Sequence, residues 1–117
     1  MISIVEDDVS VREAIEAFLK SAGIKSRSYG SAEEFLSGHI AVANDILILD
    51  LNLPGISGYD LLKKIRHDKT IIHVIVTTAF DEPGSRDFCR QYGVKEYMRK
   101  PVDGEALIDL IKYNIPV

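Results

Sequence analysis

Short aliphatic and β-branched segments alternate along the chain with longer segments in which apolar residues recur at helical spacing. The short segments cover residues 2–5, 25–29, 45–50, 72–77 and 96–98, and the longer ones cover 9–21, a short stretch from 31, 58–68, 83–92 and 103 to about 113. Strand and helix signals that alternate in this way are typical of a parallel sheet with helices on both faces. The pattern therefore predicts a doubly wound α/β fold with a five-stranded sheet.

Polar residues and glycines mark the ends of the helical segments. Ser31 and Glu34 have the spacing of a capping box, and Asp103 precedes the last helical segment as a candidate N-cap. Gly23 and Gly93 follow the first and fourth helical segments, where glycine commonly ends a helix. Asp8 stands just before the first helical segment, so an N-cap or an ordinary surface acid are its simplest interpretations.

The most apolar of the predicted strands ends on an acid. Four aliphatic residues, Ile46 to Leu49, precede Asp50. An open α/β sheet binds its ligands at the carboxyl ends of its strands. Polar residues also follow three other predicted strands: Glu6 and Asp7 follow the first, Thr78 the fourth and Lys100 the fifth. We therefore expect these side chains to meet in one crevice.

Such a cluster indicates a particular chemistry. Carboxylates that lie close together repel each other, and their pKa values rise unless a cation relieves them. Oxygen ligands of this kind suit Mg²⁺, which keeps several waters and is often completed by a phosphate. A carboxylate can also attack phosphorus to give an aspartyl-phosphate, and a lysine and a hydroxyl can then stabilise the transferring group. Asp50, Lys100 and Thr78 are the residues that could fill these roles.

The bulk composition fits one globular domain over residues 1–117. Hydrophobic residues make up 46% of the chain and charged residues 27%, and the net charge is −4. Nothing resembles the basic surface of a nucleic-acid-binding domain. The longest aliphatic run is far shorter than the ~20 residues that span a bilayer, and no signal peptide is evident. We therefore expect a cytoplasmic domain that contacts neither nucleic acid nor membrane.

Four stretches together resemble the receiver domain of two-component response regulators, over essentially the full length. They are "SIVEDD" (3–8), "ILDLNLPGISGYDLL" (48–62), "VIVTTAF" (74–80) and "EYMRKP" (96–101), in the family's order and spacing. The resemblance implies a flavodoxin-like (βα)5 fold with strand order 2-1-3-4-5. It also implies a phosphorylation-activated signalling switch that catalyses only its own aspartyl phosphorylation and dephosphorylation.

The resemblance assigns the metal site residue by residue. Asp7 is implied as a direct Mg²⁺ ligand and Glu6 as one that acts mainly through water. Asp50 is implied as a ligand and also as the phosphoacceptor. Asn52 is implied to complete the site with its backbone carbonyl.

Other positions match the residues that handle the phosphoryl group. Thr78 is implied to contact it through the hydroxyl, and Ala79 through the backbone N–H. Lys100 is implied to pair with the acceptor carboxylate and then with the phosphoryl group, across a cis peptide bond to Pro101. Tyr97 matches the aromatic switch position, which is implied to act together with Thr78.

The implied partners are a sensor histidine kinase or a phosphotransfer protein, with a small phosphodonor as another source of the phosphoryl group. Residues 84–113 are the expected output face, for an output domain or a homodimer. The chain is either a free-standing receiver or a fragment of a longer regulator.

Two other classes share part of this pattern. A phosphohydrolase of the haloacid-dehalogenase class also uses an aspartyl-phosphate and Mg²⁺, but it has a second acid two residues after the nucleophile, where Asn52 stands. A flavodoxin-type flavin module would need a phosphate-binding loop after the first strand, where Glu6, Asp7 and Asp8 would repel phosphate. A phosphate-ester turnover assay and a flavin absorbance spectrum separate the three classes.

Overall fold

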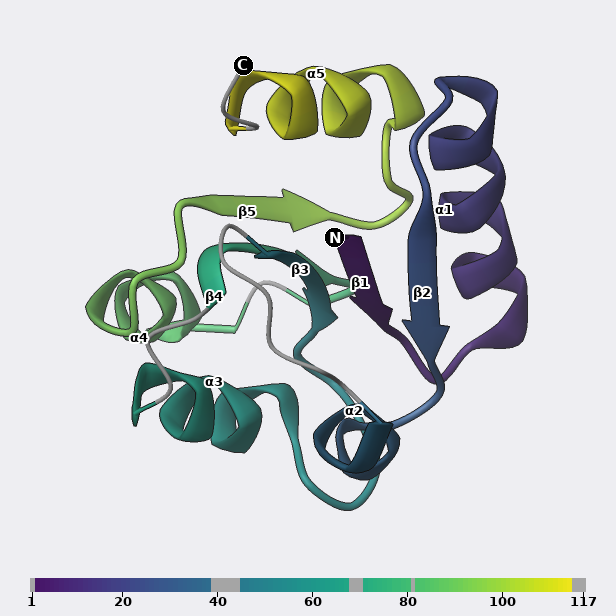
Figure 1. Cartoon of the computed structure of the whole chain (residues 1–117). Helices are drawn as coiled ribbons and strands as arrows, with labels where there is room; N and C mark the ends of the chain where they lie inside the picture. The colour runs from purple at the N-terminus through teal and green to yellow at the C-terminus, as the bar shows by residue number, and fades with distance from the viewer. Residues whose placement is uncertain (1, 39–44, 68–70, 81, 115–117) are drawn as a thin grey trace.

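The computed structural model describes residues 2–38, 45–67, 71–80 and 82–114. Strands and helices alternate through the described residues (Figure 1). The strands are β1 (Ile2–Val5), β2 (Ser26–Tyr29), β3 (Asp45–Asp50), β4 (Ile71–Thr78) and β5 (Glu96–Arg99). The helices are α1 (Val9–Ser21), α2 (Ala32–Gly38), α3 (Gly58–His67), α4 (Ser85–Gln91) and α5 (Gly104–Asn114). In these described parts, no helix is long and apolar enough to span a bilayer.

The strands form one parallel sheet in the order β2-β1-β3-β4-β5. This is the flavodoxin-like α/β arrangement predicted from the sequence, so the fold prediction is confirmed. The central strand β3 is buried along its whole length between β1 and β4. The residues of β1 pair with β3 without a shift, from Ile2 opposite Ile46 to Val5 opposite Leu49.

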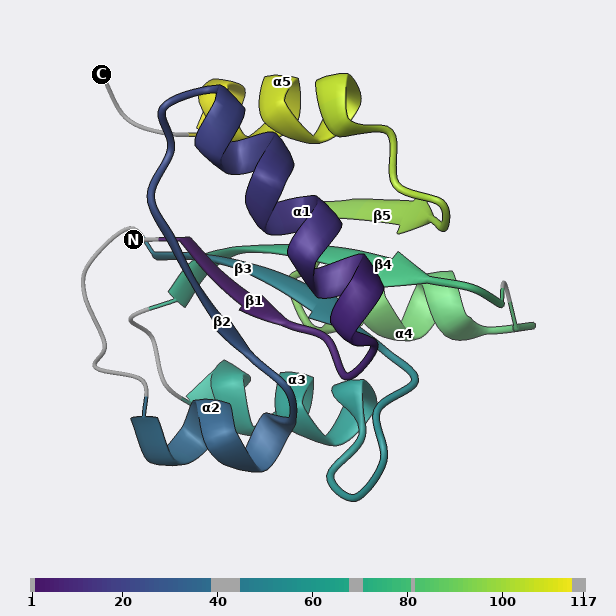
Figure 2. The same cartoon turned by 90° about the vertical axis from the view of Figure 1, so that its right-hand side faces the viewer.

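Helices cover both faces of the sheet (Figure 2). Residues of α1 and α5 pack with Ile46 and Ile48 in one core cluster. Residues of α2, α3 and α4 pack with Leu47 and Leu49 in the other. Successive side chains of a strand point to opposite faces, so the aliphatic run of β3 supplies both cores in turn.

The same alternation places the polar residues at the strand ends. Ile4 and Ile48 lie side by side on the face covered by α1 and α5. Glu6 and Asp50 each come two residues later, so both side chains continue that face at the carboxyl edge of the sheet. Lys100 follows Met98, which packs on the same face, by two residues.

Some predicted boundaries needed correction. The fourth helix was expected from Pro83 to Tyr92, but α4 begins at Ser85, because Gly84 adopts a left-handed conformation with φ of 80° and no side chain caps the helix. The strand predicted from Lys25 begins at Ser26. The predicted end of the third helix, Asp68, lies outside the described residues. Asp8 is the N-cap of α1, with its carboxylate accepting from the N–H groups of Ser10 and Val11.

Gly58, the first residue of α3, is packed against the end of β3. A Cβ atom at this position would lie 2.5 Å from the backbone oxygen of Asp50 and 2.5 Å from Leu51 Cα. The Gly58 N–H also donates to the Leu51 carbonyl at 3.0 Å. These contacts are with backbone, so an added methyl group cannot be accommodated by turning a side chain.

We therefore expect Gly58→Ala to lower the free energy of unfolding by about 2 kcal/mol or more, the range of overpacked core sites. Urea denaturation measures the loss, and amide chemical shifts of Asp50 and Leu51 report the displaced backbone. Gly93→Ala is the matched control, because Gly93 has φ of 80° at the end of α4 with no atom close to its missing Cβ. That control should lose about 1 kcal/mol to backbone strain and leave the Asp50 resonances in place. Equal stability of Gly58→Ala and wild type would contradict this packing.

Candidate functional site

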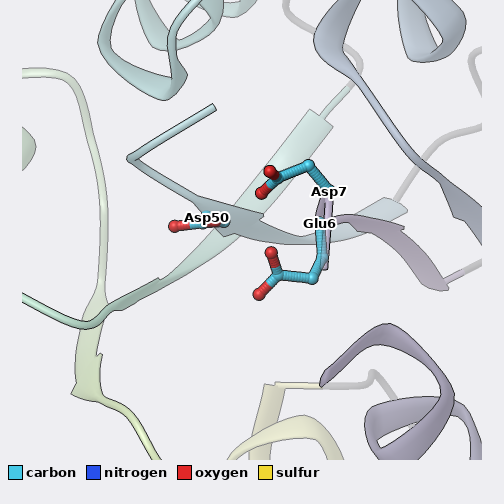
Figure 3. A group of neighbouring side chains, drawn as sticks. All are labelled: Glu6, Asp7 and Asp50. Carbon is cyan, nitrogen blue, oxygen red and sulfur yellow. The ribbon is translucent and has the colours of Figure 1, made fainter. Parts of the chain in front are cut away.

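Three carboxylates meet at the carboxyl edge of β1 and β3. One oxygen from each of Glu6, Asp7 and Asp50 lies within 4.8 Å of the others. Figure 3 shows the three side chains extending to the same side from the ends of the two strands. Glu6 is only 1% exposed and Asp50 only 3%, whereas Asp7 is exposed to solvent.

Lys100 supplies a positive charge to the two buried carboxylates. Its Nζ lies 2.5 Å from Glu6 Oε1 and 3.3 Å from Asp50 Oδ2. The backbone N–H of Lys100 donates to the Thr78 carbonyl at 2.8 Å, which ties this residue to the end of β4. The Lys100–Pro101 peptide bond is cis, as predicted.

The electrostatics of the site show that negative charge is in excess. Burial raises the pKa of Glu6 to about 7; the hydrogen bond and the charge of Asp50 add to this rise, and the bond to Lys100 only partly offsets it. Burial alone would lower the pKa of Lys100, but hydrogen bonding to Glu6 and the charges of Asp50 and Glu6 outweigh it, so the net direction is upward. The raised pKa keeps the Lys100 ammonium charged beside the two carboxylates.

Asn52, in the loop after β3, links the Asp50 carboxylate to the end of β4 through two hydrogen bonds. The N–H of Asn52 donates to Asp50 Oδ1 at 3.0 Å, and the Asn52 side-chain amide donates to Thr78 Oγ1 at 3.2 Å. The Thr78 hydroxyl in turn donates to the Phe80 carbonyl at 2.8 Å. Ala79 lies between Thr78 and Phe80 and is exposed. The bond between Asn52 and Thr78 was not predicted from the sequence, where Asn52 was assigned only a backbone role.

Tyr97 lies away from the carboxylates, on the sheet face covered by α3 and α4. Its hydroxyl shares a hydrogen bond of 3.0 Å with Ser85 Oγ, which also accepts from the Tyr59 hydroxyl at 3.1 Å. The guanidinium carbon of Arg86 lies 4.6 Å from the centre of the Tyr97 ring. Sequence reasoning missed Ser85 and Tyr59, because a serine and a tyrosine at helix starts carry no distinguishing signal.

The donor set fits Mg²⁺. It consists of carboxylate oxygens, which this hard cation prefers, and their mutual distances suit an ion with ligands at about 2.1 Å and some waters. Asp7, Asp50 and Glu6 are the side chains that would hold the ion, and no reorganisation of the backbone is needed to bring them together.

Comparison with known proteins decides the family. The sequence model of the family described as the response regulator receiver domain matches residues 2–112 of this chain. The chain belongs to this family. Receiver domains of response regulators act as phosphorylation-activated signalling domains in two-component systems, and this matches the function expected from the sequence. The haloacid-dehalogenase alternative receives no support from these matches, and the acidic N-cap after β1 disfavours a flavin phosphate site.

Relatives and solved structures agree with this assignment. The DNA-binding transcriptional regulator NtrC of Klebsiella pneumoniae is 32% identical over 108 residues, which are 92% of this chain and 23% of NtrC. FixJ of Azorhizobium caulinodans is 27% identical over 97% of this chain and 54% of its own length. The chain thus spans between about a quarter and about half of these relatives.

Among solved structures, a receiver protein from Pseudomonas putida has a TM-score of 0.85 and 28% identity, covering 96% of this chain and 94% of that one. The beryllofluoride-activated receiver domain of DrrB, a Thermotoga maritima protein, has a TM-score of 0.85 and 25% identity, covering 97% of this chain and 94% of that one.

The site makes a first prediction about Mg²⁺. Isothermal titration should detect one Mg²⁺ ion in the wild type, and Asp7→Asn should weaken the affinity by about tenfold or more, because an amide replaces a carboxylate ligand. Asp8→Asn is the matched control. It removes a neighbouring negative charge, but asparagine also caps helices well, so α1 and the affinity should be nearly unchanged. An Asp7→Asn variant that binds Mg²⁺ like wild type would refute the assignment.

Proposed function

We propose that this receiver domain accepts a phosphoryl group on Asp50, with Mg²⁺ held by Asp7, Asp50, the Asn52 carbonyl and, through water, Glu6. The observation that carries the proposal is the position of Lys100 Nζ, between the buried carboxylates of Glu6 and Asp50. A lysine there neutralises the nucleophile at rest and is already placed beside the oxygens of an incoming phosphoryl group. The domain promotes its own phosphorylation and dephosphorylation and acts on no external metabolite.

In the phosphorylation step, a carboxylate oxygen of Asp50 attacks the phosphorus of the donor. A new P–O bond forms, and the bond from phosphorus to the leaving group breaks, with its electron pair going to the leaving group. Bound Mg²⁺ would offset the charge on the phosphoryl oxygens. The N–H of Asn52 holds one oxygen of Asp50 in place, which fixes the direction of the carboxylate.

The protein also supplies donors for the transferred group. The Lys100 ammonium can turn from the Asp50 carboxylate to a phosphoryl oxygen with little movement, because it already lies 3.3 Å from Asp50 Oδ2. The Thr78 hydroxyl must give up its bond to the Phe80 carbonyl before it donates to the phosphoryl group. The Ala79 N–H is the other proposed donor. Phosphorylation therefore changes the hydrogen bonding at the end of β4.

We infer that the phosphoryl donor is a histidine kinase, a phosphotransfer protein or a small acyl phosphate, and that the domain works in the cytoplasm, where such donors act. A hollow of about 260 Å³ supports docking of a protein donor beside the site. Its mainly apolar lining includes Val11, Phe18 and Pro101, together with Lys100. A partner seated there would hold its phosphohistidine near the Lys100 end of the cluster.

The output face is proposed to include α4, β5 and α5, within residues 84–113, for an output domain or a second copy. The contact between Tyr97 and Ser85 supports this, because it joins β5 to the first residue of α4. Thr78 lies at the end of β4, which pairs with β5. A change in the bonding of Thr78 can therefore shift α4 and Tyr97 together, as a bias between two existing states.

Intact-mass measurement tests the acceptor. With acetyl phosphate and Mg²⁺, the wild type should gain one phosphoryl group and Asp50→Asn should gain none. Lys100→Gln should be phosphorylated much more slowly, since it loses the positive charge while keeping a similar length. If Asp50→Asn gains the same mass at the same rate, the nucleophile is another residue.

Chemical-shift mapping tests the output face. Beryllofluoride with Mg²⁺ should shift amide resonances in residues 84–113 of the wild type, and Tyr97→Phe should reduce the shifts in α4 because its bond to Ser85 is lost. Tyr113→Phe is the matched control, since Tyr113 is 89% exposed. Shifts confined to the carboxylate cluster would mean that this face is not the output.

A further inference from the structure

Asp7 is the one carboxylate of the described cluster that solvent surrounds, so packing does not hold its side chain. It also lies beyond β1, which ends at Val5. A ligand in such a position keeps its direction only if its backbone is fixed. Because each peptide unit is planar, the two peptide planes on either side of the Asp7 Cα determine where the Cβ points.

Both of these planes are held by side chains. The plane before Asp7 contains the Glu6 carbonyl, which accepts a hydrogen bond from Arg12 Nη1 at 2.8 Å. The plane after Asp7 contains the Asp8 N–H, which donates to Glu6 Oε2 at 3.2 Å. The bond to Glu6 uses a residue of the cluster itself. The bond from Arg12 comes from α1, one turn beyond the Asp8 cap.

We propose that Arg12 is a positioning residue of the metal site, which fixes the Glu6–Asp7 peptide so that the Asp7 carboxylate is directed at the ion. The inference rests on the proposed function, because it requires Asp7 to be a Mg²⁺ ligand. Arg12 does not touch the ion or the phosphoryl group. It acts through the backbone of the ligand.

The surroundings of Arg12 suit this role. Its Nη1 atom and Glu34 Oε2 both lie against Gly30, at 3.3 and 3.4 Å from where a Cβ would stand. Glu34 Oε2 also accepts from the Gly30 N–H at 2.7 Å. Arg12 as a whole is half-buried, and its guanidinium lies beside Gly30, as does the Glu34 carboxylate. Arg12 can reach the Glu6 carbonyl because α1 holds its backbone and because residue 30, in the turn between β2 and α2, has no side chain to block the guanidinium.

Arg12 could instead affect the metal site only through its charge, and the two roles predict opposite changes in Mg²⁺ affinity when Arg12 is replaced. A cation close to a cation site repels Mg²⁺, so removing its charge would tighten binding. Removing a positioning bond would instead weaken binding, since partners that orient metal ligands typically contribute about 10–100-fold to metal affinity. The sign of the change separates the two roles.

The experiment measures Mg²⁺ affinity by isothermal titration for wild type, Arg12→Met and Arg12→Lys. Arg12→Met should weaken the affinity about tenfold, and Arg12→Lys, which keeps a donor and a charge at similar reach, should recover much of the loss. Amide relaxation in the metal-free protein should show greater mobility at Asp7 in Arg12→Met. Arg66→Met is the matched control, because Arg66 Nη1 donates to the Gln91 carbonyl at 2.9 Å in the same kind of bond. That control should lose stability without any change in Mg²⁺ affinity.

Unchanged or tighter Mg²⁺ binding by folded Arg12→Met would overturn the inference and leave the proposed function standing. If Arg12→Met and Arg66→Met weaken binding equally, the effect is one of general stability, which also overturns it. If Asp7→Asn binds Mg²⁺ like wild type, both the metal assignment and this inference fail.

Discussion

The site depends on an electrostatic constraint that the sheet itself creates. The unshifted pairing of β1 with β3 brings Glu6 beside Asp50, and both carboxylates are almost completely buried. Two such groups cannot remain ionised together unless a cation lies between them. Lys100 provides that cation from the loop after β5. Burial nevertheless raises the pKa of Glu6 to about 7, because the bond to Lys100 offsets only part of the rise. Together with Asp7, these carboxylates form an acidic cluster of the kind at which receiver domains typically bind Mg²⁺.

The carboxylates of the site differ in their exposure to solvent, and this difference decides how each one is held in position. Asp50 ends a strand that is buried throughout, so the rigid sheet fixes the position of this proposed nucleophile. Asp7 is exposed, so an ion with its waters can reach it from solvent. Because Asp7 is exposed, packing does not hold its side chain. Hydrogen bonds to the peptide groups on either side of Asp7 hold its backbone instead. The two proposed metal ligands thus differ: the sheet holds Asp50 rigidly, whereas hydrogen bonds to the backbone hold the accessible Asp7.

The fold and the site differ in how much of them the sequence could predict. The aliphatic run Ile46–Leu49 and its terminal Asp50 were sufficient to predict a buried central strand with a polar end, because parallel strands share one carboxyl edge. The start of α4 was predicted wrongly, since the pattern around Pro83 does not reveal that Gly84 adopts a positive φ. The contacts of Ser85 with Tyr97 and of Arg12 with Glu6 were not predicted, because they join elements whose relative distance only tertiary packing determines.

The geometry of β5 explains how one short strand can serve both the site and the opposite face. Side chains alternate along a strand, so Met98 packs on the face of α1 and α5 while Tyr97 packs on the face of α3 and α4. Lys100 continues the face of Met98 and meets Glu6 and Asp50. In the proposed switch, a change of charge at Asp50 would act on the end of β5 through Lys100, and the same backbone carries Tyr97 and its bond to α4. Lys100 follows the last residue of β5, and Tyr97 is the second residue of that strand. A short stretch of backbone therefore joins the proposed acceptor site to the proposed output face.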